Sequence, residues 1–239
     1  MGREIEKVAL DRGHEIVCII DLDEDLKFNS NEFKSADVAI EFTSPKSAVS
    51  NYKKAFEANI PVVSGTTGWL EQLNEIKHEC DNKGKTLFYA SNFSLGVNLF
   101  FALNAYLSKL MNKFSEYDVC LEETHHIHKM DAPSGTAITL ADEIISNINK
   151  KTSWALENKS DIDYIDTKEN PTETLKIKSI REGEVLVIHT VVYKSEVDSI
   201  SITHEAFSRK GFALGAVLAA EYTKDKNGFL GMKDMLEEI

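Results

Sequence analysis

Residues 1–93 alternate short, unbroken apolar runs with amphipathic segments, and this alternation constrains the fold most strongly. Strands buried on both faces read as continuous apolar runs, and helices are the usual crossovers of a parallel sheet. The runs expected to form strands are HEIVCIID (14–21), ADVAIEFT (36–43), PVVSG (61–65) and KTLFYAS (85–91). The segments expected to form helices are REIEKVALDRG (3–13), SAVSNYKKAFEANI (47–60) and WLEQLNEIKHECDNKG (69–84). The sequence therefore predicts a parallel sheet covered on both faces.

The pattern changes beyond residue 93. The next expected elements are a long helix (96–114), a strand (117–126) and a second helix (136–149). No element is expected in the polar stretch from Lys150 to Thr174. Three runs (174–181, 184–195 and 198–207) then alternate apolar with polar residues, which is typical of antiparallel strands with one solvated face. A last apolar helix (211–225) is expected to end the chain.

This order of elements predicts an α/β fold with two domains. A Rossmann-like parallel-sheet domain is expected over residues 1–93 and 206–239, and an α+β domain is inserted between them over residues 94–205.

Composition narrows the possible partners. The chain of 239 residues has a formal net charge of −12, which argues against nucleic acid or an anionic membrane as a partner. Cys18, Cys80 and Cys120 form no Cys-x-x-Cys pair, so a disulfide framework is not indicated and a cytoplasmic setting is expected. No apolar run is long enough for a transmembrane helix, and residues 1–16 lack the apolar core of a signal peptide.

An acidic residue closes the first expected strand. In dinucleotide-binding folds an acid at this place accepts hydrogen bonds from the adenosine ribose, and Gly2 precedes Asp21 by nineteen positions, close to the spacing of about 20 in the glycine fingerprint. The acidic run DLDED would repel a 2′-phosphate, which favours NADH over NADPH. An acid that ends a strand is also common as a turn residue, and the residues leave both interpretations open.

Three of the expected strands end in loops of small polar residues: EFTSP, SGTTG and ASNFS. The carboxyl ends of parallel strands meet at one edge of the sheet, where ligands of open α/β sheets bind. Glycine in such a turn lets the backbone approach a ligand closely. A ligand site is therefore expected at this edge.

The stretch EETHHIHKMDAPSGTA, residues 122–137, concentrates three histidines and a lysine beside a tight turn. A metal site, a solvated loop and an anion site all merit consideration. His125, His126 and His128 lack a carboxylate at helical spacing and a nearby cysteine, so we expect no metal. Protonated side chains this close repel one another, and an anionic ligand would compensate them.

The turn that follows favours the anion site. Ser134 can cap the next helix, whose first amides at Gly135 and Thr136 then point at a carboxylate. Lys129 adds a fixed charge, and a histidine with an ordinary pKa near 6.5 can donate a proton at neutral pH. The stretch thus predicts a site for reducing a substrate that carries carboxylates.

HHIHKMDAPSGTA resembles the signature of the 4-hydroxy-tetrahydrodipicolinate reductase family, also called dihydrodipicolinate reductases. Further similar motifs are MGR, EFT, SGTTG, SNFSLGVN, SIREGEV, HTV and SRKGFALGA, which follow the family's order and span nearly the whole chain. The resemblance implies NAD(P)H-dependent reduction of a small cyclic imine dicarboxylate in lysine and diaminopimelate biosynthesis. It also implies that the inserted domain binds substrate and joins subunits into a homotetramer.

The resemblance assigns roles to the matched positions. His125 becomes the acid/base and Lys129 the proton donor, while the substrate's carboxylates are held by His126, Ser134, Gly135 and Thr136. The cofactor residues are Gly2 and Asp21 on the adenosine side, and Phe42, Thr43, Gly65, Thr67, Ala90, Asn92 and Phe93 on the nicotinamide side. Because the histidine signature lies in the inserted domain, domain closure is expected to bring it to the cofactor.

The chain departs from the family pattern at its start. The first strand and the leading fingerprint glycines have no counterpart before Met1, and we expect the natural start to lie upstream. Val187 also stands where the family often has glycine. Two alternatives stay open: a shortened, non-catalytic homologue that keeps its assembly sheet, and a dehydrogenase acting on another aspartate-derived substrate. Tight NADH binding would exclude the first, and the second has no need for the histidine, lysine and Ser-Gly-Thr set.

Overall fold

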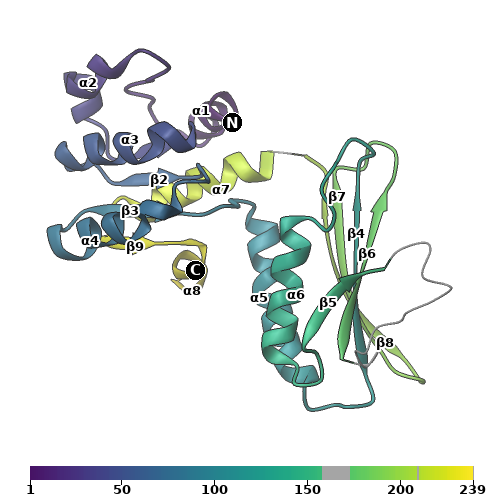
Figure 1. Ribbon diagram of the computed structural model, residues 1–239. Helices are drawn as coiled ribbons and strands as arrows, with labels where there is room; N and C mark the ends of the chain where they lie inside the picture. The colour runs from purple at the N-terminus through teal and green to yellow at the C-terminus, as the bar shows by residue number, and fades with distance from the viewer. Residues whose placement is uncertain (158–172, 209, 239) are drawn as a thin grey trace. The chain divides into compact units, whose positions relative to one another are not determined.

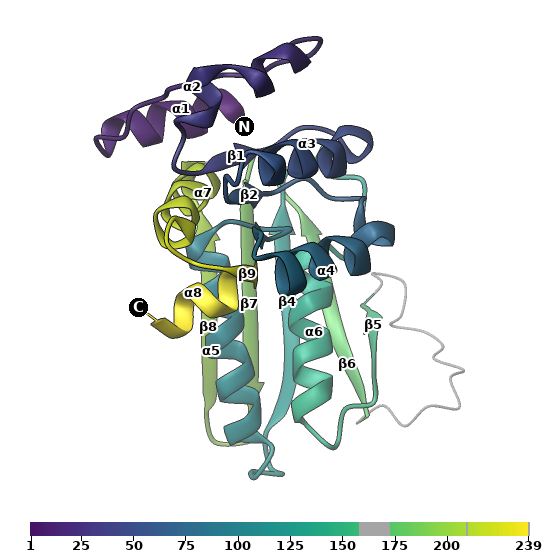
Figure 2. The same cartoon turned by 90° about the vertical axis from the view of Figure 1, so that its left-hand side faces the viewer.

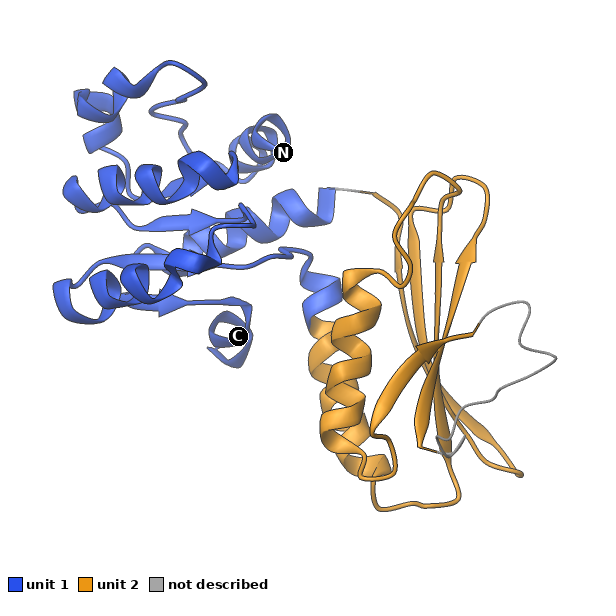
Figure 3. Cartoon of the chain, in the orientation of Figure 1, with its two compact units in different colours: residues 1–98, 209–239 blue, residues 99–208 orange. Residues whose placement is uncertain are grey.

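The computed structural model describes residues 1–157, 173–208 and 210–238. The chain divides into two compact units, residues 1–98 with 209–239 (unit 1) and residues 99–208 (unit 2), coloured separately in Figure 3. These bounds lie a few residues from the expected 1–93, 206–239 and 94–205. In the described part of the chain, no helix combines the length and the apolar character needed to cross a membrane.

Unit 1 is built on a parallel sheet with strand order β1-β2-β3-β9 (Figure 1). Its strands are β1 (Ala39–Glu41), β2 (Val62–Ser64), β3 (Thr86–Tyr89) and β9 (Gly228–Leu230). Its helices are α1 (Gly2–Asp11), α2 (Asn31–Lys34), α3 (Pro45–Glu57), α4 (Leu73–Lys83), α7 (Lys210–Thr223) and α8 (Met232–Glu238), with 3₁₀ turns η1 (Asp25–Asn29) and η2 (Leu70–Gln72).

Both faces of this sheet are buried. Val62 and Leu87 pack with side chains of α3 and α4 in one core cluster. The neighbouring residues Val63 and Phe88 face the other way and pack with α1, α7 and α8. Successive side chains of a strand point to opposite faces, so a strand buried on both sides must be apolar throughout. The expected parallel sheet is confirmed.

Two expectations for unit 1 were wrong. Residues 14–20 form no strand, although Ile16, Cys18 and Ile20 pack against the cores. β1 is the edge strand of the sheet, and none of the described strands lies beside residues 14–20 to complete a ladder of hydrogen bonds. The chain also continues past α7 into β9, which pairs with β3, and into α8. A strand of three residues is too short to show a periodic pattern.

Unit 2 is a five-stranded mixed sheet with order β5-β6-β4-β7-β8. Its strands are β4 (Asp118–His125), β5 (Ser153–Leu156), β6 (Thr174–Arg181), β7 (Val187–Lys194) and β8 (Ser199–Ala206). Helices α5 (Leu95–Met111) and α6 (Gly135–Asn147) lie side by side over one face, as Figures 1 and 2 show. The core beneath them includes Leu121, Leu140, Ile177 and Val191.

The strand directions in unit 2 are partly as expected. β7 runs antiparallel to both β4 and β8, but β6 runs parallel to β4, contrary to the antiparallel expectation. Helix α6 connects β4 to β5, and such a crossover returns the chain in the same direction, so that β5 and its parallel partner β6 both run parallel to β4. β5 lies in the polar stretch where no element was expected, and it pairs in parallel with β6.

Candidate active site

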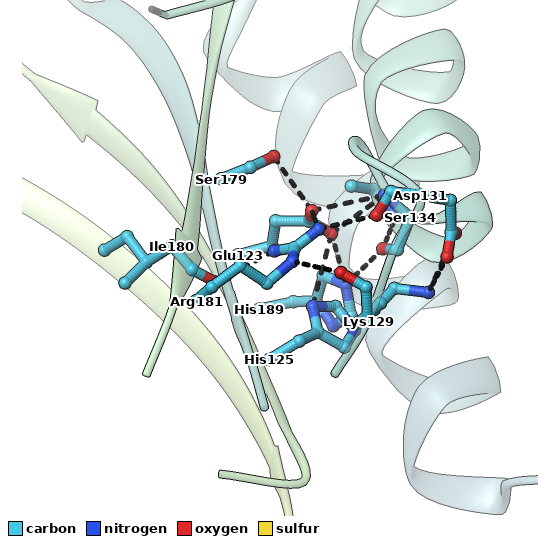
Figure 4. A network of polar contacts seen from close by, with 10 residues as sticks. Glu123, His125, Lys129, Asp131, Ser134, Ser179, Ile180, Arg181 and His189 are labelled. Carbon is cyan, nitrogen blue, oxygen red and sulfur yellow. Dashed lines mark hydrogen bonds and ion pairs between the residues drawn. The ribbon is translucent and has the colours of Figure 1, made fainter. Parts of the chain in front are cut away.

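A buried carboxylate stands at the centre of the candidate site in unit 2. Alternation along β4 places Val119, Leu121, Glu123 and His125 on the face that the helices cover. Glu123 is fully buried, so its charge needs partners inside the protein. Figure 4 shows the groups that converge on it from β6, β7 and the start of α6.

Three groups donate hydrogen bonds to the Glu123 carboxylate. The Ser134 amide lies 3.2 and 3.0 Å from its two oxygens, the Ser179 hydroxyl donates at 2.8 Å, and Nη2 of Arg181 donates at 3.4 Å. Burial alone would raise the pKa of Glu123, but its polar contacts with His189, Ser134 and Ser179 outweigh burial and hold this pKa well below its usual range. Glu123 is therefore ionised throughout the neutral range.

Ser134 joins this carboxylate to the start of α6. It is the N-cap residue, and its hydroxyl accepts a hydrogen bond from the Ala137 amide at 3.2 Å. The same hydroxyl lies 3.0 Å from Nε2 of His189. Gly135 is exposed, and a Cβ there would meet no atom within 4 Å. The space beside Gly135 in the first turn of α6 is therefore open, as an anion site at a helix N-terminus requires.

His125 is buried beside the same carboxylate. It is 7% exposed, its Nδ1 lies 3.6 Å from Oε2 of Glu123, and its ring packs edge-on against His189 with centroids 5.3 Å apart. Burial lowers the pKa of His125 to about 4; the charge of Glu123 opposes this shift, while His189, Lys129 and Arg181 add to it. His125 is therefore neutral at pH 7.

Lys129 lies on the loop between β4 and α6. Its Nζ donates to both carboxylate oxygens of Asp131 at 2.8 Å. Arg181 fixes this loop from β6: its Nε donates to the Lys129 carbonyl at 3.2 Å and its Nη2 to the Asp131 carbonyl at 2.6 Å. The backbone at Lys129 is thus held by a hydrogen bond from Arg181, the last residue of β6.

The remaining expected site residues of unit 2 lie nearby in sequence but differ in their surroundings. His126 is partly buried and its Nδ1 has no hydrogen-bond partner. His128 is exposed, and its Nε2 lies 3.0 Å from a Glu184 oxygen. Thr136 is partly buried in the first turn of α6. Thus His128 belongs to the solvated part of the loop, whereas His126 and Thr136 are partly shielded from solvent.

The described residues do contain one metal-like group, which differs from the set considered in the sequence. Glu123, His125 and His189 offer ligand atoms within 4.8 Å of one another. The oxygens of Glu123 already accept several hydrogen bonds, and the Arg181 guanidinium beside them adds positive charge. Both facts disfavour a divalent cation, and the absence of a metal stays a prediction.

Unit 1 contains a second buried carboxylate, at the end of β1. Glu41 accepts hydrogen bonds from the Thr43 amide at 3.1 Å, the Ser64 hydroxyl at 2.6 Å and the Thr66 hydroxyl at 3.1 Å, and from the Thr43 hydroxyl as well. The Tyr52 hydroxyl lies 2.7 Å from that of Ser64. Glu41 therefore fixes the loops that leave β1 and β2 against each other.

The loops of this edge bring together most of the expected nicotinamide residues. A Cβ at Gly65 would lie 2.2 Å from the Phe42 ring, so any larger residue here would force this ring to move. Phe42 packs against Phe93 with ring centroids 5.4 Å apart, and the Ala90 amide donates to the Ser64 carbonyl at 3.2 Å.

The other three nicotinamide positions lie in the same loops. Thr43 follows β1, Thr67 is exposed in the SGTTG turn, and Asn92 accepts a hydrogen bond from the Ser94 amide at 2.8 Å. The expectation that these three loops meet at one edge is confirmed.

The two adenosine-side positions are less well supported. Gly2 begins α1 and a Cβ there would meet nothing within 4 Å, so the fold does not require glycine at this position. Asp21 is exposed and follows the segment that was expected to be a strand; its own side chain accepts a hydrogen bond from the Leu22 amide at 2.8 Å. Asp21 thus behaves here as a turn residue.

Sequence reasoning missed Glu41, Glu123, Arg181 and His189. Alternation along β4 puts Glu123 in line with Val119 and Leu121, and a charged residue at an inward position is a usable signal. The other signals are weaker: Arg181 and His189 lie in SIREGEV and HTV, motifs that were noted without a role for these side chains.

Comparison with known proteins agrees with this architecture. The model of the dihydrodipicolinate reductase N-terminus matches residues 1–93, and that of the C-terminus matches residues 96–236. The chain is 47% identical to the 4-hydroxy-tetrahydrodipicolinate reductase of Christiangramia forsetii over 240 residues, covering all of this chain and 95% of the relative. It is 34% identical to the enzyme of that name from Archaeoglobus fulgidus, covering 99% and 96%.

A solved structure shares the fold. It is the dipicolinate-bound dihydrodipicolinate reductase of Paenisporosarcina sp. TG-14, with a TM-score of 0.71 and 21% identity, and the match covers 96% of this chain and 92% of that one. The family models match both parts of the chain, and the full-length relatives agree with them. The chain belongs to the dihydrodipicolinate reductase family.

Proposed function

We propose that this chain reduces 4-hydroxy-tetrahydrodipicolinate to tetrahydrodipicolinate with a pyridine nucleotide, in lysine and diaminopimelate biosynthesis. The observation that carries the proposal is the site in unit 2, where Glu123 joins a buried neutral histidine to a helix N-terminus and lies beside a lysine-bearing loop. The relatives at 47% and 34% identity carry the same enzyme name over their full lengths.

The start of α6 suits a dicarboxylate. Ser134 caps the helix, and the amides of Gly135 and Thr136 then offer donors to one carboxylate. Lys129, on the loop that leads to this turn, adds a basic side chain to a chain that is acidic overall. The solved relative holds dipicolinate, a planar dicarboxylate, which supports this class of substrate.

The residues of the chain would handle the proton. A bound reduced nicotinamide supplies a hydride, and the overall reaction consumes one proton and releases the 4-hydroxyl group as water. A substrate carboxylate next to His125 favours its charged form and so raises its pKa from the low value of the free site. Lys129 is paired with Asp131 and stands on a fixed loop, which makes it the proposed proton donor.

The nicotinamide side of unit 1 fits a pyridine nucleotide. Three loops rich in small residues meet at the carboxyl edge of the parallel sheet, and the buried Glu41 fixes two of them. NADH is proposed as the preferred form, with NADPH as the alternative, because Asp23, Glu24 and Asp25 follow Asp21 and would repel a 2′-phosphate. Roles for Gly2 and Asp21 on the adenosine side rest on the resemblance alone.

Assembly and cellular setting are proposals too. The face of the unit 2 sheet away from α5 and α6 carries partly exposed residues such as Ile188 and Val192, which suits the homotetramer implied by the family. The free cysteines Cys18, Cys80 and Cys120 suit a cytoplasmic setting.

A coupled assay tests the function. Pyruvate and aspartate semialdehyde are condensed freshly, the purified chain is added, and NADH and NADPH oxidation are followed at 340 nm in separate runs. We expect substrate-dependent oxidation that is faster with NADH and is largely lost in His125→Gln and Lys129→Met. Oxidation that is independent of the condensation product, or none with either nucleotide, would contradict the proposal.

A further inference from the structure

We propose that Glu123 is the positioning residue of the reductase site, holding the acid/base histidine, the anion turn and the lysine loop in one arrangement. This inference rests on the proposed function. Glu123 is fully buried, so it acts through the groups that it contacts. Three sets of contacts carry the argument.

The first set fixes the anion turn. The Ser134 amide donates to both oxygens of Glu123, at 3.2 and 3.0 Å. Ser134 is the N-cap residue, and the amides of Gly135 and Thr136 come directly after it in the chain. Since the carboxylate holds the backbone at the N-cap, it also sets the direction of the amides that face the ligand. The Ser179 hydroxyl at 2.8 Å holds the carboxylate itself from the other side.

The second set concerns the histidines. Oε2 of Glu123 lies 3.6 Å from Nδ1 of His125 and 3.6 Å from Nε2 of His189. Nδ1 of His125 has no hydrogen-bond partner. The negative charge of Glu123 at this distance favours the protonated form of the His125 ring. Burial lowers the pKa of His125, and the nearby side chains of Lys129 and Arg181 lower it further. Glu123 is the group that offsets them.

The third set reaches the lysine. Nη2 of Arg181 contacts Oε1 of Glu123 at 3.4 Å and the Asp131 carbonyl at 2.6 Å, while its Nε holds the Lys129 carbonyl. A guanidinium donates in a fixed planar fork, so anchoring one side of it orients the other. The position of the Lys129 backbone therefore depends on the charge of Glu123.

Register explains why these groups meet. Glu123 pairs across the sheet with Ser179 on β6 and with His189 on β7, which forms one row on the face that the helices cover. Glu122, the preceding residue, faces the opposite side of the sheet, is half exposed and pairs with Lys178 at 2.8 Å. Two adjacent glutamates thus have contrasting roles, and Glu122 provides a matched control.

The test compares the wild type with Glu123→Gln, Glu123→Asp and Glu122→Gln. We expect Glu123→Gln to lower kcat by at least about 10²-fold; neutralising the orienting carboxylate of a catalytic triad, which contacts its histidine more closely, costs about 10⁴-fold. The alkaline limb of its kcat profile should move to lower pH, because His125 loses the charge that favours its protonated form. Glu123→Asp keeps the negative charge but shortens the side chain. In this variant the limb of the kcat–pH profile should stay at its wild-type pH, while kcat falls about tenfold.

Binding measurements separate positioning from general damage. Calorimetry with dipicolinate should show affinity at least tenfold weaker in Glu123→Gln, because the Ser134 turn loses its anchor. The NADH affinity of unit 1 should stay at the wild-type value in every variant. Glu122→Gln should match the wild type in both titrations and in kcat.

Each outcome bears on a different claim. An active wild type with unchanged kcat, pH profile and dipicolinate affinity in Glu123→Gln overturns the inference and leaves the function intact. If Glu123→Gln fails to fold, Glu123→Asp decides, since wild-type turnover in that variant overturns the inference as well. A wild type without turnover rejects the proposed function, and dipicolinate affinity then still tests the positioning of the turn.

Discussion

Replacing Gly215 by alanine should destabilise unit 1 more than the same change at Gly211, on the same helix. A Cβ at Gly215 would lie 1.7 Å from the Phe93 carbonyl oxygen and 2.8 Å from its carbon, so α7 or the Phe93 loop must move by more than about 1 Å. A Cβ at Gly211 would meet only the Ser94 hydroxyl oxygen, at 3.9 Å.

The magnitude follows from comparing the two variants. Alanine improves helix propensity by up to about 1 kcal/mol in either position. Overpacking of a tight core contact costs about 1–3 kcal/mol, and only Gly215→Ala incurs it. For a chain of this size, each kcal/mol shifts the midpoint by about 2–4 °C, so the two variants should differ by roughly 2–12 °C.

A single tryptophan can report on unit 1 alone. Trp69 is buried edge-on between Tyr52 and Tyr89, with ring centroids 5.2 and 5.1 Å away, and Trp154 lies in β5 of unit 2. Thermal unfolding followed by fluorescence in a Trp154→Phe background therefore tracks unit 1, which matters because two units need not unfold together. Equal midpoints for Gly211→Ala and Gly215→Ala would refute the close contact between α7 and the Phe93 loop.

Three further predictions concern unit 2. His125→Gln should lower kcat by about 10²–10⁴-fold with a smaller change in KM, in steady-state assays, because proton transfer acts in the transition state. Ser134→Ala should lower the free energy of unfolding by about 1 kcal/mol in urea titrations, since the Ala137 amide loses its cap. The pKa of His125 is lowered on folding, from an ordinary 6.5 to about 4, so the folded state binds fewer protons than the unfolded state across this window. Stability should therefore fall as pH drops from about 6.5 to 4, and this slope should be shallower in His125→Gln.

The sequence predicted the elements of the site better than the contacts between them. The loop after β4 and the start of α6 were located because a capping serine and a cluster of titratable residues are local signals. The three loops at the carboxyl edge of unit 1 were located because small polar residues follow the apolar runs, which is also a local signal. These loops lie next to one another because β1, β2 and β3 are adjacent and parallel.

Long-range pairing decided the rest. Glu123 meets Ser179 and His189 only because β4 lies between β6 and β7 in a particular register, which periodicity along one strand does not reveal. The strand expected over residues 14–21 had a suitable apolar pattern, but a ladder needs a neighbour, and none of the described strands supplies it. β5 and β9 are three or four residues long and leave no periodic trace.

Transfer of a labelled hydride tests the central claim most directly. The purified chain is given the fresh condensation product of pyruvate and aspartate semialdehyde together with NADH that carries deuterium at the transferable C4 position, and the product is analysed by mass spectrometry. The account predicts tetrahydrodipicolinate with one added deuterium, formed by the wild type and largely absent with His125→Gln. Oxidised nucleotide without labelled product, or equal labelling by the wild type and His125→Gln, would contradict it.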